Sequence, residues 1–161
     1  MYTLKFIDVH QANVVGLGAE KFSAGLVSKL LGIEEINISN VYLNRSASDK
    51  ESKTYTNIIF VNYHFGWLSR VVEICLWRFY RKQKNELLVF GDLPLNTSSK
   101  QYVLCQQSLI FKDFPLLTIN YFKFRLFRIL FKSFLKNNDV VLVQTAEMAR
   151  IQVFKVPGLP K

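Results

Sequence analysis

The stretch from Glu86 to Ile110 contains two short apolar runs, and each run ends in polar residues. The first is Leu87–Phe90, which is followed by the sequence Gly-Asp-Leu-Pro, and the second is Tyr102–Cys105, which is followed by Gln-Gln-Ser. Continuous apolar runs of this length between turn residues are typical of strands that are buried on both faces of a parallel sheet. Ligands of such sheets bind beyond the carboxyl ends of the strands. We therefore expect an α/β domain with a cleft beside these polar residues.

The rest of the chain alternates between strand-like and helix-like patterns. Further strands are predicted at Leu4–Val9, Ile36–Leu43, Asn57–Tyr63 and Val140–Val143, and helices at Lys21–Leu31, Gly66–Lys84 and Thr118–Leu135. The resulting order is β, α, β, β, α, β, β, α, β. Strands that alternate with helices over short connections indicate a Rossmann-like, mainly parallel sheet with helices on both faces.

Composition indicates one folded domain without export signals. The chain has 161 residues, half of them hydrophobic, which is enough for a single core. No apolar run approaches the roughly 18 residues that a membrane span needs, and Asp8 and His10 interrupt the N-terminal apolar stretch. Cys75 and Cys105 form neither a disulfide framework nor a metal-ligand spacing. We therefore expect a cytoplasmic protein and no metal site.

The net charge of +9 indicates an anionic partner, because much of it lies in two segments that also contain aromatic residues, Arg78–Lys84 and Lys123–Lys136. In the predicted helix Thr118–Leu135 and just after it, one side is expected to carry four basic residues: Arg125, Arg128, Lys132 and Lys136. Basic amphipathic helices bind anionic membrane surfaces. The alternative is a helix that packs on the core with a solvated basic face. No nucleic-acid-binding motif accompanies the charge.

Gly16 and Gly18 lie between the first predicted strand and the first predicted helix. They do not complete a dinucleotide fingerprint, because Lys21 occupies the position of its third glycine. A glycine-containing loop before a helix still allows a ligand phosphate to approach backbone N–H groups. Alternatively, the two glycines serve only the geometry of the turn.

Three residues are candidates for acid–base chemistry. His10 and His64 are the only histidines, and both lie near predicted strand ends. Asp92 follows Gly91 at the carboxyl end of a strand. For each histidine the alternative is a structural hydrogen bond, and for Asp92 it is capping of the backbone in the turn.

Three segments resemble the N-terminal domain of family-4 glycosyltransferases of the GT-B fold, which build bacterial surface polysaccharides. Leu88–Leu95 is similar to the family's strand and Gly-x-x-Pro turn. Lys100–Gln107 resembles its next strand, which commonly ends in Gln-Asn or His-Asn. Asp139–Met148 resembles its element of Asp, apolar strand, Gln-Thr or Ser, and Met, which follows a basic helix. The loop at Gly16–Gly18 corresponds to the family's glycine loop, where consecutive glycines are more usual.

The resemblance implies that residues 1–155 bind a sugar acceptor, which is often linked to a polyprenyl lipid, and that the basic surface contacts the inner face of the plasma membrane. Gly16 and Gly18 would then lie near the phosphates of a nucleotide-sugar donor. The acceptor cleft would be lined by four residues: Asp92, Gln106, Gln107 and Thr145.

In that family the donor is bound by a C-terminal domain through a Glu-x7-Glu motif. Residues 156–161 look like the linker to that domain, so we expect this chain to be incomplete by itself. No cofactor is expected besides the donor substrate. The alternative function is a membrane-surface or partner-binding α/β module that performs no chemistry.

Overall fold

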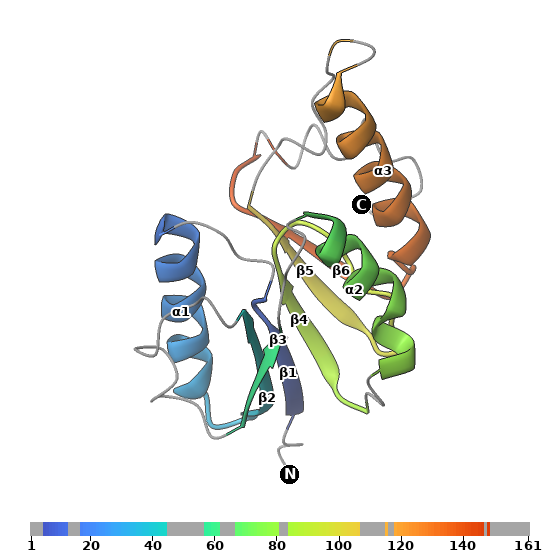
Figure 1. Ribbon diagram of the computed structural model, residues 1–161. Helices are drawn as coiled ribbons and strands as arrows, with labels where there is room; N and C mark the ends of the chain where they lie inside the picture. The colour runs from blue at the N-terminus through green and yellow to red at the C-terminus, as the bar shows by residue number, and fades with distance from the viewer. Residues whose placement is uncertain are drawn as a thin grey trace.

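The computed structural model describes residues 5–12, 17–44, 57–61, 67–80, 84–106, 115, 118–146 and 148. This part of the chain folds into one sheet with helices on its two faces (Figure 1). The strands are β1 (Lys5–His10), β2 (Ile36–Asn44), β3 (Ile58–Val61), β4 (Glu86–Phe90), β5 (Gln101–Cys105) and β6 (Val140–Val143). The helices are α1 (Leu17–Leu31), α2 (Trp67–Tyr80) and α3 (Ile119–Phe134). The predicted order of elements is confirmed.

The six strands form a parallel sheet in the order β3-β2-β1-β4-β5-β6. This is the strand order of the Rossmann fold, so the predicted fold class is confirmed. β1 pairs with β2 on one side and with β4 on the other. The strand order therefore reverses between β1 and β4, and in open α/β sheets ligands bind at such a switch point, outside the carboxyl ends of the strands.

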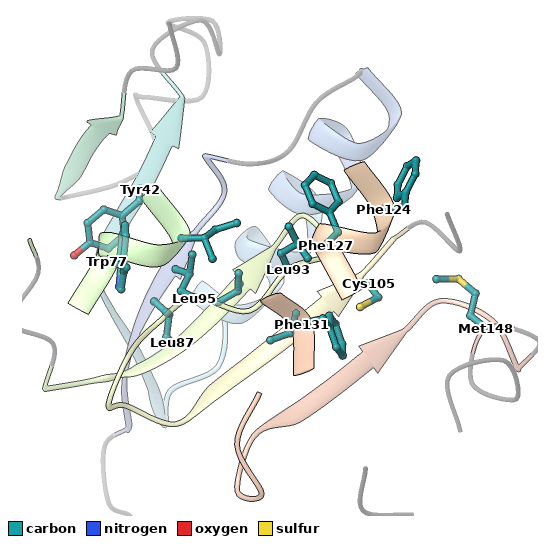
Figure 2. Close-up of a cluster of buried hydrophobic side chains, with 13 residues drawn as sticks. Tyr42, Trp77, Leu87, Leu93, Leu95, Cys105, Phe124, Phe127, Phe131 and Met148 are labelled. Carbon is teal, nitrogen blue, oxygen red and sulfur yellow. The ribbon is translucent and has the colours of Figure 1, made fainter. Parts of the chain in front are cut away.

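Alternate residues of β4 face two separate parts of the hydrophobic core. Leu87 and Val89 pack with α2 and α3, whereas Leu88 and Phe90 pack on the other face, with α1. The expectation that β4 is buried on both faces is confirmed. Figure 2 shows the first of these clusters, in which the phenylalanine rings of α3 cover the loop after β4 and the end of β5.

Helix α3 agrees with its sequence prediction at both ends. Thr118 is the N-cap, and its hydroxyl accepts a hydrogen bond from the Tyr121 N–H at 3.1 Å. Leu135 is the C-cap. The buried residues follow the spacing of a helix face, and they are Phe124, Phe127, Leu130 and Phe131.

The other two helices differ from the predicted ranges. α1 begins at Leu17, four residues before the predicted start, so that Gly18 lies in its first turn. The glycines favoured a loop in the sequence, but a single glycine is tolerated within a helix. α2 is described as far as Tyr80, and Lys84, predicted to be its last residue, lies in the connection to β4.

Candidate functional site

The carboxyl ends of β1, β4 and β5 lie side by side in the sheet, and we call this region the carboxyl edge (Figure 1). Polar residues occur at all three ends: His10 and Gln11 at β1, Asp92 after β4 and Gln106 after β5. The sheet therefore brings three of the predicted site residues, His10, Asp92 and Gln106, to one edge. The edge includes the switch point between β1 and β4, where a ligand is expected.

Asp92 fixes the turn that follows β4. Gly91 and Asp92 both have positive φ values, 108° and 73°. Glycine adopts this region freely and aspartate tolerates it better than most residues do. The Asp92 carboxylate accepts a hydrogen bond from the Gln106 N–H, and the Asp92 N–H donates to the Leu104 carbonyl at 3.4 Å. Asp92 thus joins the ends of β4 and β5, which is the backbone-capping role that the sequence offered as the alternative to catalysis.

Arg70, in the first turn of α2, supports the same turn from the helix side. Its guanidinium donates to the Gly91 carbonyl at 3.2 Å. Burial lowers the pKa of Arg70, and the nearby Asp92 carboxylate acts in the opposite direction. An arginine stays protonated in proteins, so Arg70 offsets the charge of Asp92. Arg70 was not predicted to be a site residue, because it lies within an apolar helical pattern.

His10 is completely buried against α2. Its Nε2 atom lies 3.1 Å from the Glu73 carboxylate, and its ring is nearly perpendicular to that of Trp77 at a centroid distance of 4.9 Å. Nδ1 has no hydrogen-bond partner in the described part of the chain. When Nε2 carries the proton toward Glu73, Nδ1 is a hydrogen-bond acceptor. Glu73, like Arg70, was not predicted to be a site residue. The other histidine candidate, His64, lies outside the described residues.

Buried polar atoms without partners gather around this edge. Among the residues that the structure describes, five such atoms occur: His10 Nδ1, Gln11 Nε2, Gln11 Oε1, Trp77 Nε1 and Gln106 Nε2. Three of the four residues lie at the ends of β1 and β5, and the fourth, Trp77, contacts the His10 ring. Most buried polar side-chain atoms in proteins have a partner. The unpaired atoms make this edge the candidate site of the described part of the chain.

Gln11 was not predicted to be a site residue. It is 4% exposed, and its backbone N–H donates to the Tyr42 carbonyl at 2.8 Å, while both of its side-chain polar atoms are unpaired. Its position would have indicated it, because Gln11 follows the end of β1 as Asp92 and Gln106 follow β4 and β5. The glycines downstream made residues 11–20 resemble a turn instead.

The remaining predicted cleft residues lie elsewhere or cannot be placed. Thr145 is exposed after β6, an outer strand of the sheet, and its hydroxyl accepts a hydrogen bond from the Met148 N–H at 3.1 Å. Gly18 is in the first turn of α1. Gly16 and Gln107 lie outside the described residues.

The outer surface of α3 mixes cations with large apolar side chains. Arg125 and Lys132 are exposed, and Arg128 is half-buried. Beside them Phe122 and Ile129 are 55% and 53% exposed, which the predicted division into one basic side and one apolar side did not include. We call these five residues the α3 surface.

Lys136 does not belong to the α3 surface. It follows the C-cap of α3, and its ammonium group donates to the carbonyls of Ser98 and Ser99 at 3.1 and 2.6 Å. Of the four basic residues expected along one side of this helix, three therefore belong to it: Arg125, Arg128 and Lys132.

Other kinds of site find no support in the described part of the chain. It contains no group of three or more His, Cys, Asp or Glu residues that is arranged to hold a metal ion. Cys75 and Cys105 are free thiols, and burial raises the pKa of both. None of the helices in these ranges combines the length and hydrophobicity that crossing a membrane requires.

Comparisons with family models, with curated proteins and with solved structures give no match to this chain. Its function has to be inferred from the carboxyl edge, the α3 surface and the sequence motifs.

Proposed function

We propose that this chain is the acceptor-binding, N-terminal part of a glycosyltransferase of the GT-B type. The enzyme would transfer a sugar from a nucleotide-sugar donor to a saccharide or lipid-linked acceptor during bacterial surface polysaccharide synthesis. The observation that carries the proposal is the set of unpaired polar atoms at the carboxyl edge, on Gln11, Gln106 and His10. Uncharged hydrogen-bonding groups such as these can both donate hydrogen bonds to and accept them from the hydroxyl groups of a saccharide.

The family-like segments support the proposal through their position. Leu88–Leu95 comprises the end of β4 and the Asp92 turn, and Lys100–Gln107 comprises β5 and Gln106. Both segments therefore contribute polar groups to the same edge of the sheet. In the third segment, Asp139–Met148, the aspartate precedes β6 and serves the opposite edge, where it holds the backbone N–H of Gln101.

Individual roles follow from the contacts. Asp92 and Arg70 hold the turn between β4 and β5, and Gln106 presents an unpaired amide donor. His10 is the candidate for accepting a proton, because Glu73 engages Nε2 and Nδ1 is unpaired. Donor phosphates would approach the N-terminus of α1, near Gly16 and Gly18.

The proposal requires a donor-binding domain, because transfer needs the donor and the acceptor to be held together. The test is to mix the purified chain with separately expressed candidate donor domains that contain the Glu-x7-Glu motif. Labelled nucleotide sugars and polyprenyl-linked acceptors would report sugar transfer. We expect product only when both parts are present. Absence of turnover with every donor domain, while vesicle binding is retained, would refute the enzymatic function.

The second candidate function is a membrane-surface module without chemistry, and the α3 surface favours it. Helices α2 and α3 cover the same side of the sheet (Figure 1). On α3, Phe122 and Ile129 are exposed together with Arg125 and Lys132. Apolar side chains enter the headgroup region of a bilayer, and each cation near an anionic surface contributes about 1 kcal/mol. A membrane contact is also compatible with a lipid-linked acceptor.

Binding to vesicles that contain anionic lipid, at low salt, tests this contact. We expect the double variant Arg125→Gln, Lys132→Gln to bind more than tenfold more weakly, since about 2 kcal/mol is lost. The double variant Phe122→Ser, Ile129→Ser should also bind more weakly. The matched control is Lys21→Gln, Lys29→Gln, which removes two exposed cations from α1 on the opposite face of the sheet. An equal loss in this control would mean that net charge, rather than the α3 surface, causes binding.

A further inference from the structure

We propose that Gln11 forms a sugar-recognition site at the switch point, in which its amide group binds two neighbouring hydroxyl groups of a saccharide. The inference rests on the proposed function and adds a residue that determines which acceptor is bound. Its first support is burial without partners. Gln11 is 4% exposed, and neither its amide nitrogen nor its amide oxygen has a hydrogen-bond partner in the described part of the protein.

The second support is the place of Gln11 in the sheet. The pairing with β2 continues through the Gln11 N–H, so the extended backbone places this side chain on the same face as Val9, the α1 face. By the same alternation Gln106 follows Leu104, which also packs on the α1 face. β4 lies between these two strands, and Phe90 at its end faces α1 as well. Gln11 is level with Phe90, whereas Gln106 lies two residues beyond the level of Phe90 on the other side of β4, so the two glutamines are about 12 Å apart.

The charges around this position favour a neutral ligand. Arg70 lies beside Asp92, and His10 beside Glu73, so the described ionisable groups of the carboxyl edge occur as partnered sets. The amide of Gln11 offers one donor group and one acceptor. A phosphate or carboxylate would leave the Gln11 oxygen opposite a negative charge. Two adjacent hydroxyls match it, because one accepts from Nε2 while the other donates to Oε1.

The stability of two matched variants shows whether the Gln11 amide has a partner in the free protein. Gln11→Met keeps the approximate volume and removes unpaired polar atoms, so we expect Tm to rise by about 2–4 °C. Gln101→Met is the control, because Gln101 is also fully buried but donates to and accepts from Leu95 and contacts Asp139. Its Tm should fall. A fall of Tm in both variants would show that Gln11 has a structural partner, such as a bound water, and would overturn the proposal.

Binding to the complete 161-residue chain is the decisive measurement. The probes are methyl glycosides of glucose, galactose, mannose and N-acetylglucosamine, titrated into isotope-labelled protein and followed by NMR. We expect at least one glycoside to bind, and Gln11→Met to weaken that binding about tenfold. A deoxy analogue that lacks one of the two contacted hydroxyls should bind the unsubstituted chain more weakly as well, and Gln11→Met should remove this discrimination. Equal affinity of the two proteins, or no binding of any glycoside, would overturn the proposal.

The result of the glycoside titration can be distinguished from that of the transfer assay. Glycoside binding that depends on Gln11, together with no transfer in the presence of any donor domain, would refute the glycosyltransferase and retain the sugar site. Transfer that is unaffected by Gln11→Met would retain the enzyme and refute the role of Gln11.

Discussion

Two buried glutamines lie at opposite edges of the sheet and differ in their partners. At the amino edge, which we define by the starts of β5 and β6, Gln101 accepts from the Leu95 N–H at 2.9 Å, and its amide nitrogen lies within 3.1 Å of three acceptors. At the carboxyl edge Gln11 is buried as well, and neither of its polar side-chain atoms is paired within the described structure. An unpaired buried amide costs stability, whereas a paired one does not. The buried amide at the amino edge therefore stabilises the fold, whereas that at the carboxyl edge is unpaired among the described residues.

Asp139 is the centre of the amino edge. Its carboxylate accepts from the Gln101 N–H at 3.0 Å and from the Lys136 N–H at 2.9 Å, and it also contacts the Gln101 amide. It thus ties the start of β5 to the connection between α3 and β6. The aspartate of the family-like segment accordingly has a structural role in this chain.

The largest effect is expected when this edge is broken by Asp139→Ala. The backbone N–H groups of Gln101 and Lys136 lose their acceptor, and the Gln101 amide loses one of its three, so the free energy of unfolding should fall by about 3 kcal/mol. Urea denaturation measures the change, and Asn138→Ala is the control, because Asn138 is exposed and should change stability by less than about 0.5 kcal/mol. If Asp139→Ala and Asn138→Ala lower the free energy of unfolding by similarly small amounts, the hydrogen bonds of the amino edge do not stabilise the fold as expected.

Asp92 provides the corresponding test at the carboxyl edge. Asp92→Ala removes the acceptor of the Gln106 N–H, leaves Arg70 without its neighbouring charge and places alanine at a positive φ, so we expect a loss of about 2 kcal/mol. Asp92→Asn keeps a side-chain oxygen and tolerates this backbone, and it should lose about 1 kcal/mol. Urea denaturation distinguishes the two. If Asp92→Asn is as unstable as Asp92→Ala, the charge rather than the capping oxygen is what matters.

The strands and α3 could be predicted from the sequence because their signals are local. β4 and β5 are apolar runs bounded by turn residues, and α3 has a helical apolar spacing with Thr118 as its cap. The strand order depends on contacts between distant segments, which no local pattern contains. It is this order that places His10, Asp92 and Gln106 at one edge.

The site residues that were not predicted lie in local sequence patterns that are typical of an ordinary helix or loop. Arg70 and Glu73 lie within an amphipathic helix, and their roles arise only because α2 packs over the ends of β1 and β4. Gln11 precedes a glycine-containing stretch and therefore resembled part of a loop. Lys136 fits the helical spacing of the basic residues, but the helix ends before it.

Loose packing of the carboxyl edge is an alternative cause of its unpaired amides, and Cys105 tests it. Burial raises the pKa of the Cys105 thiol above its ordinary value of 9.0. A pKa that is higher in the folded state contributes stability that is complete below pH 9 and is lost as the pH rises toward the folded value. Between pH 9 and pH 10 the protein should therefore lose about 1 kcal/mol that the Cys105→Ala variant does not lose. Urea denaturation at both pH values measures this difference.

Cys75→Ala is the matched control for this experiment, because Cys75 is only half-buried and should account for less of the pH dependence. An identical pH dependence in the unsubstituted and Cys105→Ala proteins would mean that solvent reaches the end of β5. The unpaired amides would then be hydrated rather than reserved for a ligand.

The smallest effect is expected for Lys136→Gln, which separates the amino edge from the α3 surface. The Lys136 side chain is one-third exposed and lies 4.0 Å from the Asp139 carboxylate, and such partly exposed ion pairs contribute less than about 1 kcal/mol. Because its ammonium group is bound to the Ser98 and Ser99 carbonyls, we expect a small loss of stability and unchanged binding to anionic vesicles. Arg125→Gln, on the exposed face of α3, should show the opposite pattern: unchanged stability and weaker vesicle binding. Equal loss of vesicle binding in the two single variants would return Lys136 to the membrane-facing row that its spacing in the sequence predicts.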